Sequence, residues 1–257
     1  MNRISAAFFR RIGWTKTMDW HHDGINRMIA SSLISLPFDN LSVFDAPDIQ
    51  LSQAYIIEKI LTKGQGGLCY ELNPLLHLVM EECGLVASLI TATIYDNAEK
   101  QWFAFSDTHV LNIVEWNARV WVVDIGLGLN SPRLSVPLDG EVVEYGGSEY
   151  RIVQEASYYH LNYKRREATE WSIGYRFAID YRRASIGELE RSRHIITFEE
   201  VSPFNKNPMS AIFTATGHEV MTLSGHTITR NGKKIKIPLT ETQFRALVNE
   251  RACPVDV

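Results

Sequence analysis

The sequence has few cysteines, no excess of basic residues and no long apolar run. Its three cysteines, Cys69, Cys83 and Cys253, form neither a CxxC pair nor a zinc-like spacing. A formal net charge of -4 argues against a nucleic-acid-binding protein with a broad basic surface. The apolar patch over residues 6–9 is too short for the apolar core of a signal peptide or for a membrane span. We therefore expect free thiols in a reducing compartment, the cytoplasm, and neither nucleic acid nor a membrane as partner.

Nucleotide-binding glycine motifs such as GxGxxG and GxxxxGK are also absent from the sequence, as are internal repeats and low-complexity linkers. The composition, 45% hydrophobic and 22% charged residues, is that of an ordinary globular protein. At 257 residues the chain could hold one to three domains. The sequence thus predicts a substantial folded core and excludes the common phosphate-binding loops.

Helical and β-type patterns occupy different parts of the chain. Apolar residues at helical spacing predict a helix around residues 25–34, and Ser52 is a plausible N-cap for a second helix ending near residue 61. Segments rich in β-branched and aromatic residues then predict strands in a barrel or strongly curved sheet, over 88–95, 109–114, 120–125, 149–155 and 171–179. From about residue 201 we expect further strands, a hairpin turning at Asn231-Gly232, and a final helix capped by Thr240 and Gln243.

The glycine-rich stretch from Gly64 to Asn73 delivers Cys69 to the start of an apolar helix. Glycines allow a sharp turn and a close approach to a ligand, and a helix N-terminus favours thiolate over thiol. Pro74 leaves the start of the helix open, because proline is best tolerated in a first turn. Either the helix begins near Cys69 with Pro74 in its second turn, which we favour, or Asn73 caps a helix that begins at Pro74. Cys69 is accordingly a candidate nucleophile, the alternative being a small buried cysteine after a tight loop.

A cysteine nucleophile needs a base and a group that orients the base. If the segments 109–114 and 120–125 form a hairpin centred between residues 116 and 117, paired residue numbers sum to 233, as 109 and 124 do. His109 and Asp124 would then face each other across the ladder, within hydrogen-bonding reach. A slip of one residue would turn Asp124 to the other face. His77 is an alternative base and Asp107 an alternative orienting group.

Taken together, these residues and several short motifs resemble the arylamine N-acetyltransferase family over most of the chain. Leu36–Leu41 resembles its (I/L)PFEN(L) element, Gly66–Asn73 its RGGxCxExN signature, and 124–128 its DVGFG element. Thr108-His109-Val110 carries its histidine, and the segments 202–205, 216–218 and 223–225 resemble its C-terminal third. The resemblance implies an α+β fold with an N-terminal helical bundle, a β-barrel and a C-terminal α/β lid, which we place at 1–86, 87–200 and 201–257. It also implies a papain- or transglutaminase-like Cys-His-Asp core.

The resemblance further implies a reaction and a set of contacts. Cys69, His109 and Asp124 would form the triad, and acetyl-coenzyme A would acetylate Cys69 before the acetyl group passes to an arylamine or arylhydrazine. The backbone N–H groups of Cys69 and Val110 would stabilise the oxyanion. The remaining implied contacts are Phe38, Tyr70 and Leu127 for the amine, and Gly126, Leu127 and Gly128 for coenzyme A. No metal is implied.

Two departures from the family pattern keep other functions open. Gln65 stands where the family usually has arginine, and Leu127 replaces an aromatic residue. The same triad could hydrolyse a thioester or amide, or the chain could be a ligand-binding paralogue without turnover. A basic hairpin with Arg230, Lys233, Lys234 and Lys236 could meet coenzyme A phosphates, although a solvated face is the commoner role. The sequence leaves a homo-oligomeric assembly open.

Overall fold

A computed structural model describes residues 3–14 and 22–257 of the chain. Residues 1–2 and 15–21 of the predicted helical bundle lie outside this description. The α-helices are α1 (Arg3–Arg11), α2 (His22–Ser35), α3 (Leu41–Asp45), α4 (Gln53–Ile57), α5 (Cys69–Glu82), α6 (Ile186–Phe198) and α7 (Glu241–Glu250). As predicted, the Ser52 hydroxyl caps α4, accepting from the backbone N–H of Tyr55, and a π-helical turn over Glu58–Thr62 continues that helix.

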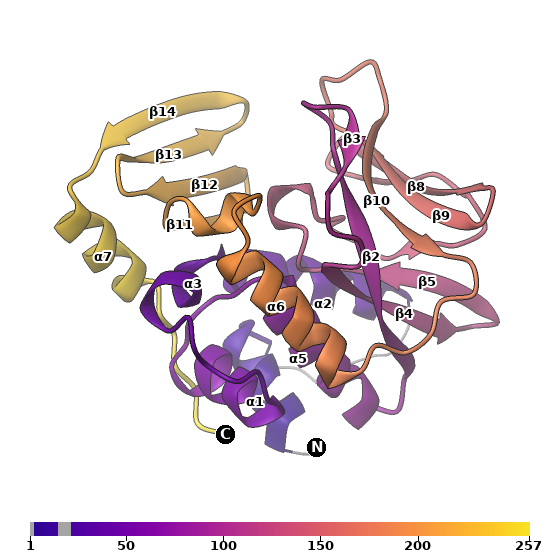
Figure 1. The fold of residues 1–257 in the computed structure, drawn as a ribbon, viewed down its shortest axis with the longest axis horizontal. Helices are drawn as coiled ribbons and strands as arrows, with labels where there is room; N and C mark the ends of the chain where they lie inside the picture. Colours follow the sequence, from indigo (N-terminus) through magenta and orange to yellow (C-terminus); the bar gives the residue numbers. More distant parts are fainter. Residues whose placement is uncertain (1–2, 15–21) are drawn as a thin grey trace.

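Helix α5 is the centre of the first part of the protein. It begins at Cys69 with Pro74 inside it, so the first of the two predicted starts is confirmed. Most of its side chains are buried, and it packs against α1, α4 and the strands β2 and β4 (Figure 1). The nucleophile candidate therefore enters the core at the first residue of a helix that is covered on nearly all sides.

A nine-stranded antiparallel sheet forms the second part. Its path runs β6-β5-β4-β2-β10-β9-β8-β7, with the short β3 paired to β2. Because β6 also contacts β8, the sheet curls back on itself, and the predicted barrel-like α+β architecture is confirmed. The strands are β2 (Val86–Asp96), β3 (Gln101–Trp102), β4 (His109–Trp116), β5 (Arg119–Val123), β6 (Val136–Pro137), β7 (Val143–Tyr145), β8 (Ser148–Glu155), β9 (Tyr158–Lys164) and β10 (Ser172–Ala178).

The β4–β5 hairpin has a different register from the predicted one. Paired residue numbers sum to 235, as in Asn112 with Val123 and Trp116 with Arg119, so the predicted sum of 233 was wrong. The turn consists of Asn117 and Ala118, both with positive φ, which is the geometry of a two-residue type I′ turn. A shift of two in the sum keeps every side chain on its predicted face, because side chains alternate with a period of two.

The last part of the chain forms a second, five-stranded sheet in the order β1-β11-β12-β13-β14. Its strands are β1 (Phe38–Asp39), β11 (Met209–Thr214), β12 (Gly217–Thr222), β13 (Gly225–Arg230) and β14 (Lys233–Pro238). The predicted hairpin turn at Asn231-Gly232 and the capping box of α7 are both present. Strand β1 comes from the first part of the chain and pairs with β11, so hydrogen bonds join the predicted helical bundle to the predicted lid. The division of the chain at residues 86 and 200 remains a prediction.

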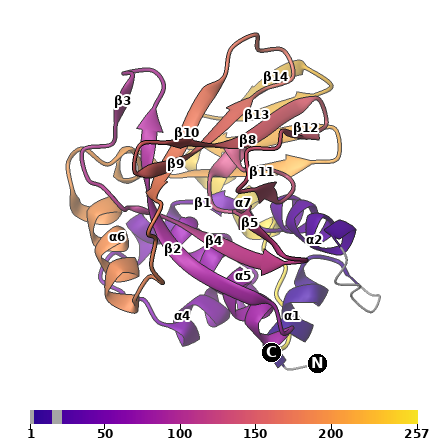
Figure 2. The ribbon, with the colours of Figure 1, turned by 90° about the vertical axis from the view of Figure 1, so that its right-hand side faces the viewer.

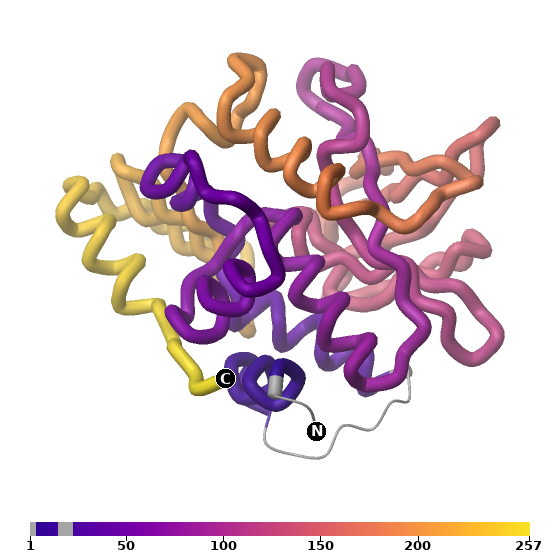
Figure 3. The backbone as a smooth tube through the Cα atoms, turned by 60° about the horizontal axis from the view of Figure 1, so that its bottom comes forward, coloured from indigo at the N-terminus to yellow at the C-terminus, as the bar shows by residue number. Residues whose placement is uncertain are grey.

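Segments distant in sequence meet around this framework. Helix α6 crosses in front of α5 between the two sheets, and the C-terminal segment returns to lie beside α1 (Figures 1 and 3). The return is held by backbone bonds from Cys253 to Gly64 and from Val255 to Leu61. Viewed from the side, α5 lies behind β2 and β4 (Figure 2). In the described part of the chain, no helix combines the length and apolarity needed to cross a membrane.

Candidate active site

Cys69 is a buried cysteine at the first position of α5, with its side chain 5% exposed. Its own N–H has no partner within the helix, because the first four N–H groups of a helix have none. The preceding N–H, of Leu68, is capped by the Glu71 carboxylate at 2.9 Å. Glu71 in turn forms a 2.6 Å ion pair with Lys59, and both side chains are buried. Glu71 is an acidic residue in the first turn of α5, where a negative charge is favourable. Through its bonds to the Leu68 N–H and to Lys59 it also fixes the loop that presents the Cys69 thiol.

His109 opens β4 and is bonded to Asp124, just beyond the end of β5. The imidazole Nε2 lies 2.8 Å from Asp124 Oδ2, and both side chains are buried. Strand β5 ends at Val123, so the carboxylate reaches His109 from outside the ladder rather than from a directly opposed position. With Nε2 engaged, Nδ1 is the ring nitrogen left to face the Cys69 thiol, and the thiol itself donates to the backbone carbonyl of the neighbouring Thr108 at 3.8 Å.

The Asp124 carboxylate is held by two further donors. Its Oδ1 accepts from Asn73 Nδ2 at 2.8 Å and from the backbone N–H of Gly126 at 2.7 Å. Asn73 also donates to the Val110 carbonyl at 2.6 Å and accepts from the N–H of Ile125 at 3.0 Å. One amide on α5 thereby joins the nucleophile helix, β4 and the loop after β5, and it aims the carboxylate at His109.

The electrostatics of the site place a proton on the histidine. Burial by itself lowers the pKa of His109, but the charge of Asp124 and hydrogen bonds to Asp124 and Cys69 raise it to about 10. The Tyr175 ring lies 5.0 Å from the imidazole with an interplanar angle of 31°, and burial together with Asp124 raises the pKa of Tyr175 well above its usual value. At neutral pH the imidazole is therefore cationic and the phenol is neutral.

This raised pKa predicts a specific pH dependence of stability. Folded His109 keeps a proton that the unfolded chain releases above its ordinary value of 6.5, so its contribution is complete below pH 6.5 and is lost as pH rises towards about 10. The free energy of unfolding should fall across that window, with a slope of at most about 1.4 kcal/mol per pH unit. Urea denaturation of the wild type and of His109→Gln should therefore give a stability difference that shrinks between pH 6.5 and pH 10. A pH-independent difference would contradict the assignment.

The glycines after Asp124 are placed for close contact with the nucleophile. A Cβ on Gly126 would lie 2.7 Å from Cys69 Cα and 2.6 Å from Asn73 Nδ2. Gly128 has a φ of +61°, and a Cβ there would lie 3.2 Å from the Phe38 ring. Only residues without a Cβ allow the loop to lie against the thiol and the cavity wall at these distances.

Cys69 and His109 line a cavity of about 380 Å³ between the barrel, α6 and the second sheet. Among the described residues around it, His109 is the only one with an ionisable nitrogen or oxygen. Phe38 and Phe204 meet edge to face in its wall, with ring centroids 5.8 Å apart. The other apolar side chains of the lining are Leu68, Ile94, Phe103, Leu127, Leu129, Ile196, Pro203, Met209, Ala211 and Val220.

The cavity brings together most, but not all, of the sequence-predicted contacts. Phe38, Gly126, Leu127 and Gly128 line it. Tyr70 does not, because its side chain is 1% exposed and buried in the core cluster of the first part. We therefore leave Tyr70 out of the substrate site.

The alternative base and orienting group lie elsewhere. His77 Nε2 is 2.8 Å from Arg183 and 3.3 Å from Glu81, and His77 lies more than two turns beyond the nucleophile along α5. Asp107 is exposed on the loop before β4. Sequence reasoning missed the roles of Asn73 and Tyr175. A buried asparagine within the apolar run of α5 was the available signal for the first, whereas nothing local marks Tyr175.

Comparison with known proteins adds independent information. A family model described as N-acetyltransferase matches residues 23–251. An uncharacterised acetyltransferase of Bacillus subtilis, YvcN, is 31% identical over 89% of this chain and 89% of its own. Arylamine N-acetyltransferases of Bacillus cereus and Bacillus anthracis are 28% and 29% identical, each alignment covering 98% of both chains, with TM-scores of 0.90 and 0.88. The B. cereus enzyme is described as having a Cys-His-Glu triad. The carboxylate found here is that of Asp124, which is one methylene shorter.

Proposed function

The chain belongs to the N-acetyltransferase family that includes the arylamine N-acetyltransferases. On this premise we propose how its site carries out the transfer of an acetyl group. The protein is an acyltransferase that moves an acetyl group from acetyl-coenzyme A to the nitrogen of an arylamine or arylhydrazine. Cys69, His109 and Asp124 are its triad. The observation that carries the proposal is the buried His109–Asp124 bond of 2.8 Å beside a cysteine at a helix N-terminus.

In the first half-reaction the thiolate of Cys69 attacks the thioester carbonyl. The cationic His109 holds the proton that the thiol has lost and returns it to the departing thiolate. Asp124 keeps the imidazole in the orientation that presents Nδ1, because both of its oxygens are occupied by fixed donors. The product of this half-reaction is acetyl-Cys69.

In the second half-reaction the amine nitrogen attacks acetyl-Cys69, His109 accepts the proton of the amine, and the thiolate is released. The backbone N–H groups of Cys69 and Val110 are the proposed oxyanion donors. The Val110 carbonyl accepts a hydrogen bond from Asn73 Nδ2, and Asn73 lies about one turn after Cys69 on α5. Because the N–H and C=O of one strand residue point to the same side, this bond supports the proposed role of the Val110 N–H. Removal of such a donor costs about 2.7–4 kcal/mol of transition-state stabilisation in other enzymes.

Coenzyme A supplies the activated acetyl group when bound, and the residues around the thiol fit a slender thioester arm. Gly126 and Gly128 expose backbone at the cavity wall, and Leu127 contributes an apolar side chain. We propose these three residues as contacts to the arm, as the sequence predicted. The proposed amine contacts are Phe38 and Leu127.

The proposal is tested by incubating the protein with acetyl-coenzyme A and measuring its intact mass. One acetyl group should be added to the wild type and none to Cys69→Ala, whereas Cys253→Ala, which removes an exposed thiol, should still be acetylated. Addition of an arylamine should discharge the adduct and yield the acetylated amine. No adduct on the wild type would contradict the proposal, and free acetate as the sole product would assign hydrolysis instead.

The lining of the cavity predicts which acceptors are preferred. No described lining residue offers a cation to an acidic acceptor apart from His109, which is already bonded to Asp124. A buried carboxylate without a partner is costly, so methyl 4-aminobenzoate should exceed 4-aminobenzoate in kcat/KM by at least about tenfold. The comparison is conservative, because the ester withdraws more electron density from the amine. Equal values would show that the acid finds a partner in the cavity.

Coenzyme A and an aromatic amine are the partners of the proposed reaction. The cytoplasmic location and a homo-oligomeric assembly remain predictions. The three donors around Asp124, among them His109, disfavour the alternative of a ligand-binding paralogue without turnover, since a chain released from catalysis has no need to keep them.

A further inference from the structure

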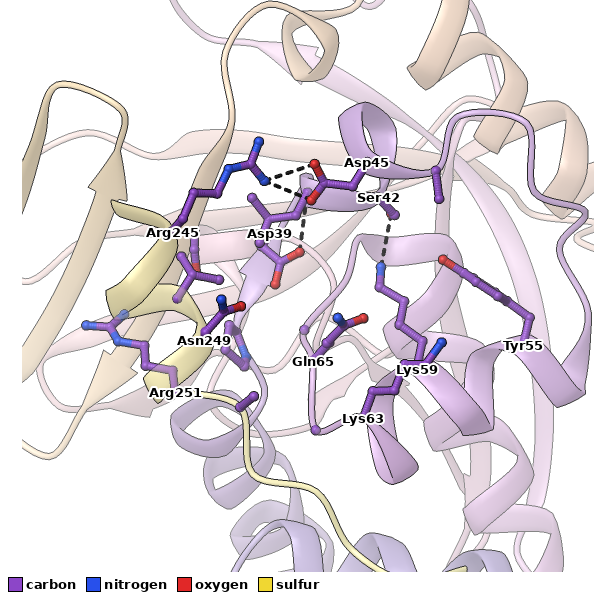
Figure 4. A pocket seen from close by; sticks show the side chains of 18 residues that line it. Asp39, Ser42, Asp45, Tyr55, Lys59, Lys63, Gln65, Arg245, Asn249 and Arg251 are labelled. Atoms are coloured by element: carbon purple, nitrogen blue, oxygen red, sulfur yellow. Dashed lines mark hydrogen bonds and ion pairs between the residues drawn. The ribbon is translucent and has the colours of Figure 1, made fainter. Parts of the chain in front are cut away.

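A second pocket, of about 260 Å³, lies on the other side of the nucleophile loop from the active-site cavity. It is enclosed by β1, α3, the loop Gly64–Gly66 and helix α7 (Figure 4). The active-site cavity is lined mainly by apolar side chains, whereas the lining of this pocket also includes four cations, two carboxylates and two side-chain amides. Its volume is several times the roughly 30 Å³ occupied by one water molecule, so a polyatomic ligand fits it.

Every cation in the lining already has a carboxylate partner. Arg245 pairs with Asp45 at 2.9 Å, and Lys59 pairs with Glu71 at 2.6 Å. Lys63 pairs with Glu58 on the surface, and Arg251 pairs with Glu219. In Figure 4 the Arg245 guanidinium is directed at Asp45, and Arg251 points away from the pocket. No described lining cation is therefore free to neutralise a further acid.

Asp39 is that further acid. Its side chain is buried, and its bonding partners are backbone N–H groups, those of Leu41 at 3.3 Å and of Gly66. Together with Lys59 and Glu71 it makes a buried group of two carboxylates and one ammonium, which carries one uncompensated negative charge. Burial raises the pKa of Asp39 to about 6, with Lys59 opposing the rise and Glu71 adding to it, so the carboxylate is mostly ionised above neutral pH.

The surroundings of Asp39 indicate the kind of cation that would compensate it. Gln65 and Asn249 face the same space as the carboxylate and add amide oxygens as acceptors (Figure 4). The described residues contain no group of three acidic, histidine or cysteine side chains that could hold a metal ion. A planar guanidinium has several N–H donors, pairs with a carboxylate through two bonds and is less strongly hydrated than an ammonium.

We propose that this pocket is a binding site for a small guanidine compound, whose cation pairs with Asp39 and donates to Gln65 and Asn249. The site is separate from the acetyl-transfer reaction, and its test does not depend on that reaction. Gln65 lines the same pocket as Asp39, and the Asp39 carboxylate accepts from the N–H of the next residue, Gly66, so an arginine side chain at position 65 would supply the same cation from within the chain.

The test is a titration with methylguanidinium chloride at pH 8, followed by thermal unfolding and by isothermal calorimetry. At ten times its Kd the ligand should raise the Tm of the wild type by about 3 °C in a saturable manner, and methylammonium chloride at equal ionic strength should not. Asp39→Asn should lose the response. Asp48→Asn, which removes a surface charge outside the pocket, should keep it.

Gln65→Arg keeps the proposal testable if Asp39→Asn fails to fold. This variant retains Asp39, and it should have a higher Tm than the wild type without ligand and no further response to methylguanidinium. The proposal is overturned if the wild type gives no saturable response, if methylammonium is as effective, or if Gln65→Arg responds like the wild type.

Discussion

Replacing Asp124 with asparagine should reduce the rate of acetylation of Cys69 by about 10³–10⁴-fold while leaving the fold intact. In the wild type all contacts of the carboxylate are made with donors: Asn73 Nδ2, the Gly126 N–H and His109 Nε2. An asparagine keeps one oxygen, so its NH₂ group must face at least one of these donors. The imidazole then loses the charge that keeps it protonated and the bond that fixes its orientation.

The measurement is the single-turnover rate of acetyl-Cys69 formation from acetyl-coenzyme A, together with the rate of thiol alkylation as a function of pH. A positioning role predicts that both the acetylation rate and the neutral-pH alkylation rate fall. Asp107→Asn is the matched control, because Asp107 lies two residues before His109, is exposed, and has a positive φ that asparagine tolerates. If both variants keep the wild-type rate, Asp124 is not part of the triad.

Gly126→Ala should lower the acetylation rate by about 10²-fold or more, for a steric reason. The added methyl group would lie 2.8 Å from Cys69 Cβ, 2.7 Å from Cys69 Cα and 2.6 Å from Asn73 Nδ2. Cys69 Cα and Cβ belong to the first residue of α5, and Asn73 Nδ2 is held by bonds to Val110 and Asp124, so the loop or the start of α5 must move. A displacement of about 1 Å at a reacting centre is enough to cost about 10²-fold in rate.

Gly187→Ala, in the first turn of α6, is the matched control for this substitution. The nearest atom to a Cβ there is Ser185 Oγ at 3.8 Å, so the change should leave the acetylation rate unaltered. A helical alanine should also stabilise the fold by about 0.5–1 kcal/mol relative to glycine, measurable by urea denaturation. Wild-type activity in Gly126→Ala would show that the loop after β5 is free to move away from the thiol.

The local chemistry of the chain determined the elements and the candidates. Glycines before Cys69, the caps at Ser52 and Thr240, and the Asn231-Gly232 turn each act within a few residues, so they could be identified in the sequence and are present in the structure. The helix start at Cys69 followed from the same kind of reasoning. The motifs also indicated the family, because their order along the chain is itself sequence information.

Only the tertiary structure decided how the candidates meet. The residue numbers paired across the β4–β5 hairpin sum to 235 and not to the predicted 233, because the turn is made by Asn117 and Ala118, which both have positive φ. Side chains alternate with a period of two, so His109 and Asp124 still lie on one face. Asn73, Tyr175 and the unpaired Asp39 gain their roles from neighbours 30 or more positions away, such as Asp124 for the first two and Asn249 for the third. A sequence specifies which groups are available, but burial and long-range contacts determine which of them become charged, paired or left without a partner.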